Sequence, residues 1–264
     1  EIFKYRSAPK QISWIGYTNS TGLEEMDYIV TDPNVLENGE NYSEKFLELP
    51  EIWNCHLPIK QRIKVEELPA LENGYVTFGS FNNFAKISHE TIDIWSDLLL
   101  KLKSKLILKT SDENFQFWEN TLLSKFEKKG ISPKNIEFIK RTKSIEDHLR
   151  CYNKIDIALD TFPYNGATTS FESIWMGVPV LTLCGNTFHS RYGFSINKNL
   201  GMDNFIAKNK IEYVNKAIKI SSKLNFTKLN EIRNSLRQKA ISSPLFDNET
   251  FNKNLIEKIS KISN

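Results

Sequence analysis

Long apolar runs are absent from this sequence of 264 residues. No stretch approaches the roughly 18 apolar residues that a membrane-spanning helix needs, and residues 1–10 contain no apolar core of a secretory signal. We therefore expect a cytoplasmic protein with no membrane partner. The chain does not begin with methionine, which is what a fragment or a processed protein would show.

Cysteine and net charge are also scarce. Cys55, Cys151 and Cys184 lie far apart and form no CxxC pair, so neither a disulfide framework nor a zinc site is indicated. We expect buried or neutral thiols and no metal. The formal net charge of +3 is too small to indicate a nucleic-acid partner, although it does not oppose a small anionic ligand.

Several familiar signatures are missing as well, namely GxGxxG, GxxxxGK[ST], HExxH and GxSxG. Their absence argues against a dehydrogenase, a P-loop nucleotidase, a zinc protease and an α/β-hydrolase. With 40% apolar and 25% charged residues, the composition is that of an ordinary globular protein. The length suits one large domain, or one domain and part of another.

The most informative stretch that is present runs over residues 155–183 and has the pattern strand, loop, helix, strand. Turn formers fill its loop at 163–166, and a helix is predicted over 169–176. A helix that begins directly after such a loop points its free backbone amides and the positive end of its dipole at the edge of the sheet. This is a favourable place for a phosphate group.

Strands and helices alternate from residue 75 onward. The expected strands are 75–79, 105–109, 135–139, 155–160 and 179–183, and the expected helices are 89–103, 113–128, 144–152, 169–176, 187–199, 209–223, 228–240 and 248–262. Such alternation gives right-handed crossovers and a parallel sheet. We predict an α/β fold, a doubly wound Rossmann-like unit over about 65–240.

The first part of the chain is less regular. Short strands are predicted at 11–16 and 28–31, followed by an irregular connector over 34–64. Within the connector, 43–49 is predicted to form a short helical piece.

In a doubly wound sheet, ligands bind outside the carboxyl ends of the strands. After the strand at 75–79 come the turn formers Asn82 and Asn83, and then Lys86, just before a helix start at Ser88. A lysine at this place is either a point charge for a diphosphate or a solvated side chain near a helix cap.

Three further features carry two interpretations each. His148 is a lone histidine, a residue that is more often structural than functional. Thr168 and Thr169 are either helix N-caps or donors to phosphate. Glu172, one turn later, either faces solvent or accepts hydrogen bonds from a ribose diol.

Five blocks of the sequence also resemble a known family. They are WIGYTNSTGLEEMDYIVTD at 14–32, YSEKFLELP at 42–50, FGSFNNFAKIS at 78–88, the long block DHLRCYNKIDIALDTFPYNGATTSFESIWMGVPVLTL at 147–183, and HSRYG at 189–193. In this order they resemble the catalytic region of O-linked N-acetylglucosaminyltransferase and SPINDLY-like proteins, glycosyltransferase family 41. The resemblance implies a GT-B architecture of two Rossmann-like lobes, with the sugar nucleotide held chiefly by the C-terminal lobe.

The resemblance also implies a division of the chain. Residues 1–64 would be the end of the N-terminal catalytic lobe and a connector, 65–240 the C-terminal nucleotide-sugar-binding lobe, and 241–264 a helix that packs back on the other lobe. Tetratricopeptide repeats and most of the N-terminal lobe would lie upstream.

Matched position by position, the resemblance implies a role for eight residues. Lys86 would be the catalytic lysine on the donor diphosphate; the donor would also be bound by Asn83, His148 beside the base, Thr168 and Thr169 at the pyrophosphate, Glu172 on the ribose, and Ile15 and Gly16 at the sugar. Two departures are Ala167, where animal enzymes have histidine, and Thr18, where proline often follows the GY pair.

The implied activity is inverting transfer of N-acetylglucosamine from a UDP-sugar to Ser or Thr of a protein acceptor, with no cofactor and no metal. Alternatives implied by relatives are GDP-fucose as donor, or UDP-glucose with asparagine as acceptor. An alternative of another class is a non-catalytic nucleotide-sugar-binding module.

Overall fold

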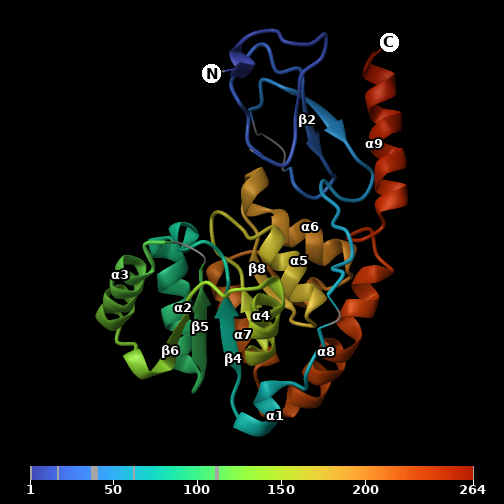
Figure 1. Ribbon diagram of the computed structural model, residues 1–264. Helices are drawn as coiled ribbons and strands as arrows, with labels where there is room; N and C mark the ends of the chain where they lie inside the picture. The colour runs from blue at the N-terminus through green and yellow to red at the C-terminus, as the bar shows by residue number, and fades with distance from the viewer. Residues whose placement is uncertain (1, 17, 37–40, 62, 111–112, 264) are drawn as a thin grey trace.

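The computed structural model describes residues 2–16, 18–36, 41–61, 63–110 and 113–263, and Figure 1 shows their arrangement. Its main element is a six-stranded sheet in which every pair of neighbours is parallel. The strands are β4 (Thr77–Ser80), β5 (Lys105–Lys109), β6 (Ile136–Ile139), β7 (Ile157–Leu159), β8 (Val180–Leu183) and β9 (Ile206–Ala207).

The strand order is β6-β5-β4-β7-β8-β9, so the chain winds outward from β4 in one direction and from β7 in the other. This is the doubly wound order predicted from the alternating pattern. The order reverses between β4 and β7, and in open parallel sheets ligands bind at the carboxyl ends of the strands beside this reversal. The loops after these two strands are therefore where a site is expected.

Helices cover both faces of this sheet. They are α1 (Pro69–Asn73), α2 (His89–Lys101), α3 (Phe115–Lys128), α4 (Ile145–Arg150), α5 (Thr168–Trp175), α6 (Tyr192–Asn199), α7 (Lys210–Ile220), α8 (Phe226–Ile241) and α9 (Asn248–Ser263). Helix α2 packs on α3 and α7, whereas α5 packs on α8. Of these elements α1 and β9 were not predicted, and the helix predicted over 187–199 is a 3-10 turn at Phe188–Ser190 followed by α6.

A smaller parallel sheet lies near the N-terminus, in the order β1 (Ile12–Ser13), β2 (Tyr28–Thr31) and β3 (Lys45–Glu48). The helical piece predicted at 43–49 is wrong, because this segment forms β3 and pairs with β2 along its whole length. The residue types Lys, Phe, Leu and Glu have local propensities that allow a helix. The hydrogen bonds to β2 and the burial of Leu47 stabilise the strand instead. Residues 37–40 and 62 of the predicted connector lie outside the described residues.

Helix α9 runs alongside the three-stranded sheet (Figure 1), and the two are joined by aromatic packing. The rings of Phe251 and Trp14 stack with centroids 5.8 Å apart, and the indole N–H of Trp14 donates to the carbonyl of Trp53. The C-terminal helix thus contacts the first part of the chain, as its apolar face requires. The division at residues 64 and 240 stays a prediction.

No helix in the part of the chain that the structure describes has both the length and the apolar character needed to cross a membrane. Burial raises the pKa of the Cys151 thiol, and it raises that of Cys55 to about 12. These two thiols are therefore neutral near pH 7, as expected.

Candidate functional site

The loop after β7 is organised by Asp160, which is buried. Its Oδ1 accepts a hydrogen bond of 2.7 Å from the amide of Gly166, and its Oδ2 accepts one of 2.9 Å from the Thr182 hydroxyl. These bonds fold the loop back on its own strand and so fix where α5 begins. Asp160 was not predicted from the sequence, although an acid that directly follows an apolar strand at this edge was the available signal.

Lys86 reaches across from the loop after β4 to this folded loop. Its ammonium donates to the carbonyl of Asn165 at 3.0 Å and lies 4.1 Å from the centre of the Tyr164 ring. Burial lowers the pKa of Lys86, and the carboxylate of Asp160 partly offsets this. The side chain is half-buried and, among the described residues, donates one of its three N–H groups, so it is placed to bind an anion.

Helix α5 begins beside this ammonium, but its N-cap is Ala167 rather than either threonine. The amides of Ser170 and Phe171 bond to the Ala167 carbonyl, so those of Thr168 and Thr169 come before the first intrahelical hydrogen bond. The interpretation of the two threonines as N-caps is therefore wrong. Their amides form the kind of helix N-terminus that binds phosphate.

The two loops are held together by a hydrogen bond from the Thr169 hydroxyl to Oδ1 of Asn82, 2.5 Å long. A Cβ atom on Gly166 would lie 2.5 Å from that oxygen, so glycine is required where the loops meet. Asn83, the residue after Asn82, is exposed. It caps the 3-10 turn Phe84–Lys86, because its Oδ1 accepts from the Ala85 amide. The predicted helix start at Ser88 is confirmed, since its hydroxyl caps α2.

His148 and Glu172 meet one helical turn further along α5. Nε2 of His148 lies 2.9 Å from Oε2 of Glu172, and Nδ1 of the same ring lies 2.8 Å from Nζ of Lys109. The hydroxyl of Tyr152 lies 3.1 Å from Oε2 of Glu172. Glu172 thus lies within a polar network, and the interpretation that it simply faces solvent is wrong. Lys109 and Tyr152 were not predicted from the sequence.

Ile15 and Gly16 lie on the smaller sheet's side of this region. Ile15 has φ 64°, an unusual left-handed conformation for a β-branched residue, and its side chain is 51% exposed. The nearby Thr18 hydroxyl bonds to that of Tyr192, and the Tyr192 ring lies 6.1 Å from Tyr164. Thr18, two residues after Gly16, is thus linked through Tyr192 to Tyr164, the ring that Lys86 contacts.

The structure therefore brings the predicted residues of the main sheet to one edge, in an order along α5. Lys86, Thr168 and Thr169 lie at the start of this helix, and Glu172 and His148 follow one turn later. Among the described residues, no cluster of histidine, cysteine and acidic side chains could hold a metal ion.

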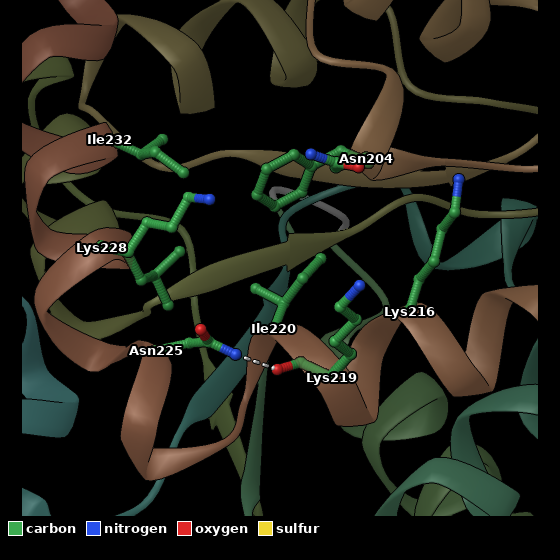
Figure 2. A pocket seen from close by; sticks show the side chains of 9 residues that line it. Asn204, Lys216, Lys219, Ile220, Asn225, Lys228 and Ile232 are labelled. Atoms are coloured by element: carbon green, nitrogen blue, oxygen red, sulfur yellow. Dashed lines mark hydrogen bonds between the residues drawn. The ribbon is translucent and has the colours of Figure 1, made fainter.

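A hollow lies away from this edge, between α7, α8 and the 3-10 turn Asp203–Phe205 (Figure 2). Its volume is about 190 Å³, and its lining combines apolar side chains with Lys216, Lys219 and Lys228. Lys216 is already bound by backbone carbonyls and by Glu212. This hollow contains none of the predicted site residues.

Asp160 gives the fold a testable pH dependence. Burial raises its pKa to about 6 from 3.8, so the folded state binds a proton at a higher pH than the unfolded state does. Its contribution to the free energy of unfolding is therefore largest at low pH and falls as the pH rises from about 4 to above 6. For Asp160→Asn, we expect the change in stability between pH 5 and pH 7 to be smaller than in the unchanged chain by about 1 kcal/mol.

Urea denaturation at the two pH values measures this change. Thr182→Val serves as the control, because it removes a partner of Asp160 but leaves the carboxyl group in place. If the stability of Asp160→Asn changed with pH as much as that of the unchanged chain, the assignment of a raised pKa to Asp160 would be wrong.

Comparison with solved structures defines the class of the protein. The chain superposes on a mutant O-GlcNAc transferase of Thermobaculum terrenum with a TM-score of 0.79 and 26% identity, covering 97% of this chain and 50% of that one. Together with the two parallel sheets and the site at the strand reversal, this shows an α/β fold of the GT-B glycosyltransferase type. The resemblance found in the sequence is thus confirmed at the level of the fold.

The family itself follows from the sequence match. The model of glycosyl transferase family 41 matches residues 1–56 and 56–255, so this chain belongs to that family. The chain is also 38% identical to the proteins named probable UDP-N-acetylglucosamine–peptide N-acetylglucosaminyltransferase SPINDLY of Solanum lycopersicum, over 256 residues, and of Petunia hybrida, over 253. In both cases the match covers 95% of this chain and 27% of the relative.

Proposed function

We propose that this chain binds the sugar-nucleotide donor of a protein glycosyltransferase, and that the donor is UDP-N-acetylglucosamine. The observation that carries the proposal is that the Lys86 ammonium, bonded to the Asn165 carbonyl, lies at the start of α5. There the amides of Thr168 and Thr169 come before the first intrahelical hydrogen bond. The ammonium and these amides are both positive and both lie at the carboxyl edge of the strands beside the reversal of the sheet. A diphosphate is the group that this arrangement suits, and the names of the relatives support a UDP-sugar.

In this proposal the sugar moves in one displacement with inversion to a Ser or Thr hydroxyl of a protein acceptor. The leaving diphosphate gains negative charge as the glycosidic bond breaks. A fixed cation and fixed amides interact more strongly with this charge in the transition state than with the ground state, and that difference accelerates the reaction. Lys86 is therefore the proposed catalytic residue, and no metal or cofactor is required by this scheme.

The remaining residues hold the rest of the donor. Glu172 uses Oε2 toward His148 and Tyr152, so its Oε1 is the oxygen that would accept from a ribose diol. Asn83 would donate its amide N–H to a phosphate, since its carbonyl oxygen already caps a turn. Ile15 and Gly16 would line the sugar. The cytoplasmic location and the upstream repeats stay predictions.

Calorimetric titration of the chain with UDP, GDP, TDP and inorganic diphosphate tests the proposal. We expect UDP to bind most tightly and diphosphate to bind weakly through Lys86 and the α5 amides. A preference for GDP would favour fucose transfer. If no nucleotide binds, the proposal of a donor site in this chain is wrong.

A further inference from the structure

Lys109 is the last residue of β5, and its side chain is only 3% exposed. A buried ammonium group is costly unless its N–H groups find acceptors or a charged partner. Lys109 lies at the same carboxyl edge as Lys86, on the neighbouring strand. The burial of this ammonium group therefore needs an explanation.

The hydrogen bonds of Lys109 are incomplete. An ammonium carries three N–H donors and no acceptor, and within the described residues Nζ contacts a single partner, Nδ1 of His148 at 2.8 Å. No carboxylate of these residues lies within 4 Å of it. Burial accordingly lowers the pKa of Lys109, and the more distant Glu172 opposes this. Two donors thus remain for which the described residues supply no acceptor.

The single bond that Lys109 makes also fixes the histidine. Because an ammonium only donates, Nδ1 of His148 accepts, and the ring proton lies on Nε2. Nε2–H then donates to Oε2 of Glu172 at 2.9 Å. The Tyr152 hydroxyl, whose pKa burial keeps well above its ordinary value, is within 3.1 Å of the same oxygen. Lys109 thus sets the tautomer of His148 and the direction of its hydrogen bond to Glu172.

We propose that Lys109 contacts the base of the bound nucleotide and selects bases that carry a keto oxygen at position 4 of a pyrimidine or position 6 of a purine. This inference rests on the proposed function. With the diphosphate at Lys86 and Thr168 and the ribose at Glu172, the base extends toward His148 and the two free donors of Lys109. Uracil and guanine present an oxygen at the corresponding ring position, whereas cytosine and adenine present an amino group, which a lysine cannot accept from.

The matched pair of UDP and CDP tests this inference, because the two bases differ only in the group at position 4 of the pyrimidine and the proton on the neighbouring N3. In calorimetric titration we expect the unchanged chain to bind UDP about tenfold more tightly than CDP, the size of effect that one base contact gives. Lys109→Met keeps the length of the side chain and removes its donors. In this variant we expect the UDP:CDP ratio of affinities to fall to about one.

The ratio does not depend on how much of a variant is folded, because misfolding lowers both affinities alike. Inorganic diphosphate, which has no base, should bind the unchanged chain and Lys109→Met equally. Inosine diphosphate and ADP form a second matched pair, because their bases differ only at positions 1 and 6 of the purine. A ratio that stays at about ten in Lys109→Met, or equal binding of UDP and CDP to the unchanged chain, would overturn the inference and leave the donor site intact. Binding of no nucleotide at all would overturn the proposed function and, with it, this inference.

Discussion

Replacing Lys86 with alanine should lower the rate constant for sugar transfer by about 10²- to 10³-fold, the usual effect of removing one group that stabilises transition-state charge. The ammonium lies beside the start of α5 and is bound to the protein through one carbonyl, that of Asn165. Its loss leaves the diphosphate with the helix amides and Asn83, and without a cation. Transfer is measured with radiolabelled UDP-N-acetylglucosamine and a protein acceptor, at saturating donor.

Lys101→Ala provides the matched control, since Lys101 is exposed at the end of α2 and lies away from the site. We expect this variant to transfer sugar at the unchanged rate. Should Lys86→Ala remain within a few-fold of Lys101→Ala, the leaving-group role assigned to Lys86 would have to be abandoned.

Arg233→Ala should have the largest effect on stability, a loss of about 3–5 kcal/mol in the free energy of unfolding. Arg233 is fully buried in α8. Its Nε donates to the carbonyl of Glu66 at 2.7 Å and its Nη1 to that of Ile155 at 2.8 Å. Alanine leaves both carbonyls without this partner, opens a cavity, and removes the positive charge near the buried Asp156.

Urea denaturation followed by circular dichroism measures the loss. The control is Arg150→Ala, in which an exposed arginine loses a 3.5 Å ion pair with Asp147. Exposed pairs of this kind contribute less than about 1 kcal/mol. Equal stabilities of the two variants would show that Arg233 does not hold α8 to the sheet.

The two parts of the proposed donor site respond differently to change. Lys86 and the α5 amides carry charge interactions that any diphosphate would share, whereas Lys109, His148 and Glu172 concern the nucleoside. Variants of the first group should weaken every ligand that contains a diphosphate. Variants of Lys109 should alter the preference among nucleotides, and variants of Glu172 should weaken every ligand that contains a ribose but not inorganic diphosphate, so the two groups can be separated by the choice of ligand.

Much of the main sheet could be predicted from the sequence, because its information is local. Short apolar runs alternate with segments that have helical spacing of apolar residues. This pattern predicts strands and crossover helices without knowledge of the residues they contact in the fold. The strand at 105–109 was predicted with its exact bounds. The residues that resemble the family also came together at one edge, since parallel strands all present their carboxyl ends on the same side.

Other features could not be predicted, because they depend on partners that are distant in the sequence. The segment at 43–49 is a strand only because β2 lies beside it, and β9 is too short to be distinguished without β8. The hydrogen bonds of Asp160 to Gly166 and Thr182 decide that α5 is capped at Ala167.

The sequence by itself thus determined most of the order of strands and helices in the main sheet, the family, and the residues that the resemblance assigns to the donor. Only the tertiary structure decided that Lys109, 39 residues before His148 in the chain, bonds to its ring. Lys109 is buried at that edge, and two of its N–H groups have no acceptor among the described residues. Such a property arises from what surrounds a side chain after folding, and no local pattern in the sequence encodes it.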